Sequence, residues 1–273
     1  MNIFDQMVAR YEVSTVAQKR NATCEVMQEI TLAGLYRSGF FNKAAFYGGT
    51  CLRIFHNLPR FSEDMDFSLI RKSSEFNLED YFPAIIEEFK AAGQEVVITR
   101  KEKKNETNVE SAFLKADTAM YDMNFKSVRD FKVKIEVDVN PPEGFNTEQK
   151  LSMLPFSFMT RCFTLEDLFA GKMHALLFRN WKNRIKGRDW FDFEWYIRHN
   201  IPLNFSHLQI RAKEFNGMDL DKDSFREMLN NRLASSDIQL VKNDVSPFVE
   251  NPASLDIWSN EYFLLLSERI KFF

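Results

Sequence analysis

The sequence predicts an α+β fold, in which a mixed β-sheet with its helices is followed by a helical carboxy-terminal region. The sheet is predicted by two stretches, residues 64–69 and 132–139, where polar and apolar side chains alternate as they do in half-buried strands. The helical region is predicted because apolar residues recur with helical spacing in the last part of the chain. We therefore expect a first domain at residues 1–163 and a helical domain at residues 164–273.

The composition limits the class of protein. The chain has 273 residues, of which 45% are hydrophobic and 28 are phenylalanine, enough for a compact and well-packed core. Its three cysteines, Cys24, Cys51 and Cys162, are scattered, so neither a disulfide framework nor a zinc site is expected and a cytoplasmic location fits best. The first residues carry charges and no long apolar stretch, so we expect neither a signal peptide nor a membrane span.

The charge balance also restricts the partners. The chain has 39 acidic and 36 basic residues, which gives a formal net charge of -3. Such a protein does not attract nucleic acid as a whole, so any contact with RNA or DNA must use a local basic patch. The charged run at residues 100–106 is interpreted as a solvated hairpin loop.

The amino-terminal part predicts helices and then a strand, a turn and another helix. Apolar residues recur with helical spacing over residues 3–38, and a break between two helices is expected near Arg20 and Asn21. The apolar run at residues 44–47 predicts a strand that ends at a pair of glycines. A helix is then expected over residues 50–56.

Later segments continue this mixture of strands and helices. The strand at residues 132–139 (KVKIEVDV) places Lys132, Lys134, Glu136 and Asp138 on one face. Further strands are expected near residues 95–100, 109–116 and 155–162. Helices are expected near residues 78–92, 165–179, 189–199, 205–214, 222–234 and 254–270.

Two aspartates on the strand at residues 64–69 predict a metal site. Asp64 and Asp66 are one residue apart on a strand and therefore share a face. Magnesium prefers oxygen ligands, and nucleotidyl transfer commonly uses two divalent ions about 3.5 to 4 Å apart. A third carboxylate is expected from the neighbouring strand, either Glu136 or Asp138, and the sequence does not choose between them. A pair of this kind also occurs on ordinary solvated strands.

A glycine turn fourteen positions before Asp64 predicts a phosphate site. Gly48, Gly49 and Thr50 lie between a strand and a helix. The first turn of a helix offers backbone N–H groups and a favourable dipole to phosphate. The alternative is a plain turn that only connects two elements.

A basic stretch in the second part of the chain predicts local anion binding. Residues 168–188 contain six basic side chains and no acidic one. The six are Lys172, Arg179, Lys182, Arg184, Lys186 and Arg188. Lys172 and Arg179 are seven residues apart, so they share a helix face that can bind a triphosphate or a nucleic-acid backbone. The alternative is a solvated basic helix end, stabilised by the helix dipole.

Other polar and aromatic residues nearby are interpreted as mainly structural. Asp189 and Asp192 lie at the start of a predicted helix, where negative charge is favourable, although Asp189 is also a candidate functional residue. His174 is interpreted as a packed histidine. The three neighbouring tryptophans are interpreted as packing residues, namely Trp181, Trp190 and Trp195.

Two blocks of sequence resemble one family. The first consists of residues 46–53 (FYGGTCLR) and 60–67 (RFSEDMDF), and the second of residues 168–179 (LFAGKMHALLFR) and 186–193 (KGRDWFDF). In order and spacing they resemble the motifs of the AbiEii/AbiGii toxin family, which belongs to the DNA polymerase β-like nucleotidyltransferase superfamily. The resemblance implies a polymerase β-like nucleotidyltransferase palm, flanked by a helical region that completes the active site.

The resemblance also implies roles for individual residues. The glycine turn would contact the phosphates of the incoming nucleotide, and the aspartate pair would bind the metals. Lys172 would neutralise the triphosphate, and Asp189 would orient Lys172 or a basic neighbour. Arg53 and Arg179 are further candidates for nucleotide binding.

The function implied is that of a magnesium-dependent nucleotidyltransferase. It would move a nucleoside monophosphate from a nucleoside triphosphate to an acceptor hydroxyl, on the 3' end of a transfer RNA or on a protein. The family further implies a toxin of a toxin–antitoxin or phage-defence system, with a cognate antitoxin as a partner and no role for a membrane. A regulatory module that binds GTP or another triphosphate without transfer is the alternative, and a metal-dependent nuclease is a weaker one.

Overall fold

The computed structural model describes residues 1–100, 118–125, 132–179 and 185–273. Three expectations fall wholly or partly outside this range: the strand near residues 109–116, the charged run at residues 100–106, and three residues of the basic stretch, Trp181, Lys182 and Arg184. The described chain divides into two compact units. The first unit consists of Met1–Asn57, Phe61–Pro141 and Thr147–Cys162, and the second of Leu58–Arg60, Pro142–Asn146 and Phe163–Phe273.

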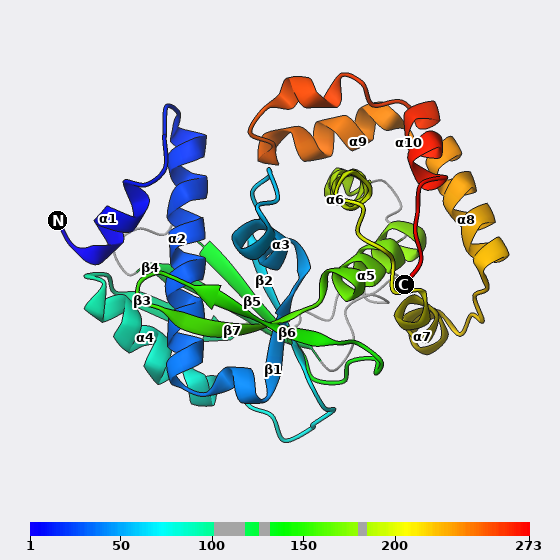
Figure 1. The fold of residues 1–273 in the computed structure, drawn as a ribbon. Helices are drawn as coiled ribbons and strands as arrows, with labels where there is room; N and C mark the ends of the chain where they lie inside the picture. Colours follow the sequence, from blue (N-terminus) through cyan, green and yellow to red (C-terminus); the bar gives the residue numbers. More distant parts are fainter. Residues whose placement is uncertain (101–117, 126–131, 180–184) are drawn as a thin grey trace. The chain divides into compact units, whose positions relative to one another are not determined.

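The predicted α+β class is confirmed, because the described residues form a mixed sheet of seven strands together with helices (Figure 1). The strand order is β3-β4-β5-β2-β1-β7-β6. In chain order the strands are β1 (Ala44–Tyr47), β2 (Asp64–Leu69), β3 (Val96–Arg100), β4 (Thr118–Phe125), β5 (Lys132–Asp138), β6 (Thr147–Ser152) and β7 (Phe158–Phe163). β2 lies at the middle of the sheet, antiparallel to β1 and parallel to β5.

Helices of the first unit cover this sheet. They are α1 (Ile3–Val8), α2 (Val16–Arg37), α3 (Gly48–His56) and α4 (Phe82–Ala91), with short 3-10 turns at Phe40–Asn42 and Leu78–Tyr81. Figure 1 shows α2 crossing one face of the sheet, and α4 packs against α2. α3 follows β1 directly and packs on β2. The core between these layers is rich in phenylalanine, as the composition predicted, and the rings of Phe46 and Phe67 stack at 4.9 Å between their centroids.

The predicted helix break near Arg20 and Asn21 is wrong. α2 runs without interruption from Val16 to Arg37. It begins at Thr15, whose side chain accepts a hydrogen bond from the backbone N–H of Gln18, while the Gln18 side chain accepts one from the backbone N–H of Thr15. This capping box fixes the start of the helix, and polar residues such as arginine and asparagine cost little inside a helix.

The second unit is helical after β7. Its helices are α5 (Leu165–Phe178), α6 (Gly187–Arg198), α7 (Phe205–Asn216), α8 (Lys222–Ser235), α9 (Ile238–Val245) and α10 (Asn260–Ser267), with 3-10 turns at Ser246–Phe248 and Pro252–Leu255. The helix expected over residues 254–270 is thus shorter than predicted, and α9 was not predicted. Trp190 and Trp195 are buried, which confirms that they are packing residues.

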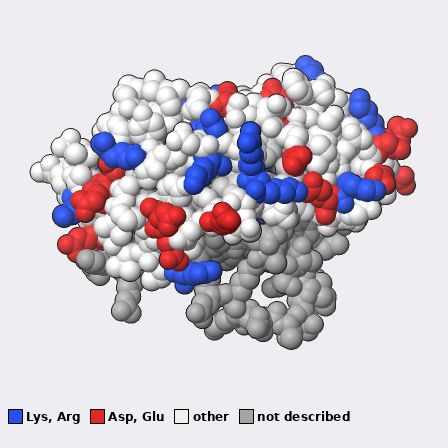
Figure 2. Space-filling model, turned by 90° about the horizontal axis from the view of Figure 1, so that it is seen from below, with Lys and Arg blue, Asp and Glu red and all other residues white. Residues whose placement is uncertain are grey.

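The surface carries both signs of charge. On the face drawn in Figure 2, Lys and Arg side chains lie among Asp and Glu side chains, and neither sign covers the face alone. This mixture agrees with the formal net charge of -3. No helix in the described part of the chain is long and apolar enough to span a membrane.

Gly34 of α2 lies directly against the backbone of α4, and Gly34→Ala is expected to lower the free energy of unfolding by about 1 to 3 kcal/mol through overpacking. A β-carbon on Gly34 would lie 2.6 Å from the Cα atom of Ile85, so only a backbone shift could make room. Urea denaturation followed by circular dichroism measures the change.

The matched control is Gly171→Ala within α5, because nothing lies within 4 Å of a β-carbon there. Alanine at an open helical position should raise stability by about 0.5 to 1 kcal/mol. Equal effects of the two substitutions would contradict the close contact at Gly34.

Candidate active site

Asp64 and Asp66 lie on one face of β2, in the middle of the sheet. Their side chains are half-buried and alternate with the buried side chains of Met65 and Phe67, which point into the core. This alternation follows from the two-residue period of a strand. The sheet therefore presents two carboxylates from a rigid support.

The strand β5 adds a third carboxylate to the same face. Because β2 and β5 are parallel and in register, Glu136 lies directly beside Asp66, whereas Asp138 lies beside Ser68. The carboxylate of Asp138 accepts a hydrogen bond of 3.0 Å from the backbone N–H of Asn140, at the end of the strand. Of the two candidates that the sequence left open, Glu136 is therefore the one adjacent to the aspartate pair.

Lys134 lies among these carboxylates. It is in register with Asp64 and two residues before Glu136, and its ammonium forms an ion pair with the Glu136 carboxylate. Burial alone would lower the pKa of Lys134, but Glu136, Asp64 and Asp66 together raise it, so the side chain is charged at neutral pH. Sequence reasoning placed Lys134 on this face and gave it no role.

The glycine turn lies directly against the carboxylates. Gly48 has a φ of +82°, and a β-carbon at this position would overlap the side chain of Asp66. The buried hydroxyl of Thr50 donates a hydrogen bond to the backbone carbonyl of Asp64. The turn is thus attached to β2 at two points, and only a residue without a side chain fits at the first of them.

This turn also forms the start of α3. Gly48, Gly49 and Thr50 are its first three residues, and the N-cap residue Tyr47 gives no side-chain hydrogen bond to the helix. The hydroxyl of Thr50 is engaged with β2, so the groups that this turn offers to an anion are backbone N–H groups.

Two further side chains fix the surroundings of the aspartates. Arg53 pairs with Glu25 of α2 at 2.9 Å and lies over the ring of Phe61, and its predicted contact with a nucleotide stays a prediction. The buried amide of Gln28 donates hydrogen bonds to the backbone carbonyls of Ser62 and Glu63, at 2.9 and 3.1 Å. Sequence reasoning missed Gln28, because no local pattern marks a helical glutamine as the support of a distant loop.

The carboxylate face suits a divalent cation in its chemistry. Its donors are carboxylate oxygens, which magnesium prefers, and it already attracts one cation, the ammonium of Lys134. As they stand, the described residues contain no group of three or more His, Cys, Asp or Glu side chains arranged so that it could hold a metal ion. A metal that binds Glu136 together with the aspartates must therefore replace the contact between Lys134 and Glu136.

The second unit contains a buried network of ion pairs around Lys172. Its ammonium lies 2.8 Å from a carboxylate oxygen of Asp189 and 2.8 Å from one of Asp192. Arg179 binds the other oxygen of Asp189 at 3.0 Å, and Arg60 binds both oxygens of Asp192 at 2.6 Å. Burial alone would raise the pKa of each aspartate, but the adjacent cations hold both pKa values below the usual range.

The two aspartates have different cation partners besides Lys172. Asp192 is completely buried and bonded to Arg60, which confirms its structural interpretation. Asp189 contacts both Lys172 and Arg179, and its implied role in orienting them stays a prediction. Sequence reasoning gave Arg60 no role, although it is the first residue of the motif segment at residues 60–67.

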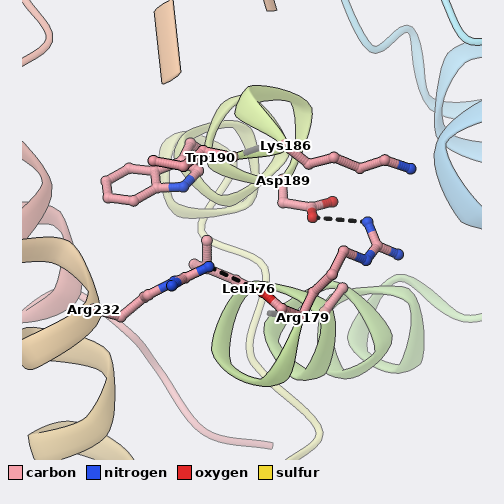
Figure 3. A pocket seen from close by; sticks show the side chains of 8 residues that line it. Leu176, Arg179, Lys186, Asp189, Trp190 and Arg232 are labelled. Atoms are coloured by element: carbon pink, nitrogen blue, oxygen red, sulfur yellow. Dashed lines mark hydrogen bonds and ion pairs between the residues drawn. The ribbon is translucent and has the colours of Figure 1, made fainter. Parts of the chain in front are cut away.

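A small pocket beside this network is rich in cations. Figure 3 shows Arg179 and Asp189 joined by an ion pair, and a guanidinium N–H of Arg232 donates to the backbone carbonyl of Arg179 at 3.0 Å. Burial and then the neighbouring Arg179 lower the pKa of Lys186, which also lines the pocket, to about 8. Three cations and one carboxylate line the pocket and give it an excess of positive charge, and anion binding by the basic stretch stays a prediction.

His174 confirms the interpretation of a packed side chain. It is buried in α5, and its Nε2 atom lies 2.8 Å from the side-chain oxygen of Asn216. Burial, together with the nearby Arg211, lowers its pKa to about 3. The imidazole is therefore neutral in the folded protein at all but acidic pH.

Comparison with known proteins finds one matching family and several similar structures. Residues 30–261 match the family described as nucleotidyl transferase AbiEii toxin, type IV TA system. The fold is similar to that of MenT4, a nucleotidyltransferase toxin from Mycobacterium tuberculosis, with a TM-score of 0.62 and 14% identity over 96% of this chain and 89% of that chain. A putative nucleotidyltransferase from H. pylori gives a TM-score of 0.48 and 17% identity over 94% of this chain and 95% of that one, too weak a likeness to carry an argument. No curated protein matches this chain.

The substitution Asp192→Asn is expected to lower the free energy of unfolding by about 3 to 5 kcal/mol, because it removes the buried negative charge that the guanidinium of Arg60 binds at 2.6 Å and that Lys172 also contacts. Chemical denaturation measures this loss. Asp219→Asn is the control, because the pair of Lys213 and Asp219 is exposed and its loss should change stability by no more than about 0.5 kcal/mol. A small loss for Asp192→Asn would contradict a stabilising role for the buried pair.

The histidine predicts a dependence of stability on pH. Below its ordinary pKa of 6.5, His174 takes up a proton in the unfolded chain but not in the folded one, until the pH approaches about 3. The free energy of unfolding therefore falls as the pH is lowered from 6.5 towards about 3. His174 contributes about 1.4 kcal/mol per pH unit to this fall. Denaturation of wild type and His174→Gln between pH 7 and 4.5 should give a shallower dependence for the variant. Parallel curves for the two proteins would exclude this contribution.

Proposed function

The chain belongs to the AbiEii family of nucleotidyltransferase toxins, as its two motif blocks predicted, and we propose that it is a magnesium-dependent enzyme that transfers a nucleoside monophosphate to an acceptor hydroxyl. One observation carries this proposal. Asp64 and Asp66 share a face with Glu136, and the glycine turn lies directly against that face. Such an arrangement brings oxygen ligands for a cation together with backbone N–H groups for phosphate.

The residues of the first unit would act as a support for the reacting groups. Asp64, Asp66 and Glu136 would hold magnesium. Asp138 accepts a hydrogen bond from the backbone N–H of Asn140 at the end of β5. Bound magnesium would neutralise the triphosphate and lower the pKa of the attacking hydroxyl. The N–H groups of Gly48 and Gly49 would bind phosphate oxygens, and Thr50 would keep the turn attached to β2.

In the second unit, Lys172 and Arg179 are the proposed ligands of the triphosphate. Asp189 contacts both cations and would hold them in a fixed orientation. The pocket beside Arg179 has an excess of positive charge, which favours an anionic substrate. No side chain is needed as a covalent nucleophile, because the acceptor hydroxyl attacks the nucleotide itself.

The remaining parts of the proposal concern the partners. The acceptor would be the 3' end of a transfer RNA or a hydroxyl on a protein, and a cognate antitoxin would counteract the enzyme in a phage-defence system. The alternative is a module that binds GTP or another triphosphate without transfer. It gains weight from the ion pair of Lys134 and Glu136, because this pair holds one of the proposed metal ligands.

Nucleotidyl transfer is tested by incubating the protein with each α-labelled nucleoside triphosphate, magnesium and total bacterial RNA and protein. Wild type should attach label to a macromolecule, and Asp66→Asn and Glu136→Gln should each reduce the rate by about 100-fold or more, because both remove a proposed ligand of the metal. Asp138→Asn is the matched control, because Asp138 lies on β5 together with Glu136. Its transfer rate should stay within about threefold of that of wild type.

The other outcomes separate the alternatives. Triphosphate bound without transfer of label would favour the regulatory module, and shortened RNA would favour a nuclease. Loss of activity in Asp138→Asn together with a fully active Glu136→Gln would assign the third carboxylate to Asp138 instead.

A further inference from the structure

We propose that Lys134 is an internal counter-ion of the carboxylate face, which makes binding of the divalent cation depend on binding of the nucleotide. The inference rests on the proposed function, because it takes Asp64, Asp66 and Glu136 as the metal ligands. In the protein without nucleotide, the ammonium of Lys134 would occupy the place of a cation. When the metal binds together with the triphosphate, the ammonium would leave Glu136 and pair with phosphate.

The position of Lys134 is fixed by the register of two parallel strands. It lies beside Asp64, and Glu136 lies two residues further along β5, beside Asp66. Side chains two residues apart on a strand point to the same face, so the ammonium and the three carboxylates project together. Lys134 pairs with Glu136, the carboxylate that β5 contributes to the proposed site.

The charges on this face favour such a counter-ion. Three carboxylates in a row on adjacent strands repel one another, and one ammonium reduces their combined charge from three negative to two negative units. The side chains of Lys134 and Glu136 are only 24% and 19% exposed, so their attraction is less weakened by water and salt than that of a surface pair. A divalent cation that binds Glu136 must therefore first overcome this attraction.

The described residues contain no ready metal site, and in the proposal the contact between Lys134 and Glu136 has to be broken to form one. The oxygens are of the right kind, but one of the three carboxylates is paired with a lysine. A cation bound to all three carboxylates would leave the displaced ammonium without a carboxylate of its own, which is costly at a half-buried position. A nucleotide supplies that partner, because its phosphates would lie at the glycine turn, against Asp66.

Lys134 is thus a positioning residue for the metal as well as a ligand for the triphosphate. The coupling is reciprocal. The factor by which the nucleotide raises the affinity for the cation equals the factor by which the cation raises the affinity for the nucleotide. Removal of the ammonium should therefore have opposite effects on the two ligands, stronger binding of the metal alone and weaker binding of the nucleotide.

The test measures the affinity for Mn2+ by titration calorimetry, with and without a non-hydrolysable triphosphate analogue. Lys134→Met should bind Mn2+ alone about tenfold more tightly than wild type, since the cation no longer competes with an ammonium. The analogue should strengthen Mn2+ binding to wild type strongly and to the variant only slightly. Lys134→Arg, which keeps the charge, should behave more like wild type than like the methionine variant.

A matched control is present on another strand. Lys150 of β6 pairs with Glu148 two residues away, at 3.0 Å, so Lys150→Met removes the same type of pair far along the sheet from Asp66. It should leave Mn2+ binding unchanged. Melting curves with and without Mn2+ check that each variant is folded, and Mn2+ should raise the melting temperature of Lys134→Met more than that of wild type.

The result that overturns the inference is equal or weaker Mn2+ affinity of folded Lys134→Met compared with wild type. Asp66→Asn separates this failure from failure of the proposed function. If Asp66→Asn binds Mn2+ as wild type does, the carboxylate face is not the metal site and both proposals fail. If Asp66→Asn loses the ion while Lys134→Met matches wild type, only the role of Lys134 is refuted.

Discussion

The turn between β1 and α3 lies so close to β2 that a side chain at Gly48 would overlap the carboxylate of Asp66. Everything else at the candidate site depends on this approach. Because Gly48 adopts a positive φ, α3 starts directly beside the aspartates, and the hydroxyl of Thr50 holds that start against the backbone of Asp64. A phosphate-binding turn and a carboxylate pair, which are separate patterns in the sequence, therefore become neighbours in one unit.

The second constraint is that the half-buried and buried carboxylates need cations close to them. In the first unit the carboxylates of β2 and β5 share the ammonium of Lys134, and in the second unit Asp189 and Asp192 are surrounded by three cations. The two solutions differ in their consequences. In the second unit the two aspartates are buried and contact the cations directly, whereas on the face of the sheet the proposal requires that the lysine give way to another cation.

The general fold could be predicted because its signals are local. Alternation along β2 and β5 and helical spacing in the second unit follow from the periods of strand and helix, which adjacent residues impose on one another. Where these signals were weak, the prediction failed. The edge strand β6 is polar and alternates little in sequence, α9 is only eight residues long, and the true start of α2 is set by the capping box at Thr15.

The sequence by itself determined which residue types are available and which of them share a face: Asp64 with Asp66, and Lys134 with Glu136. Only the tertiary structure decided their partners. The register of β2 and β5 places Glu136 and not Asp138 beside Asp66, and Arg60 meets Asp192 across 132 positions of the chain. The physical reason is that backbone periodicity depends on nearest neighbours along the chain, whereas strand register and the pairing of buried charges depend on how distant segments pack.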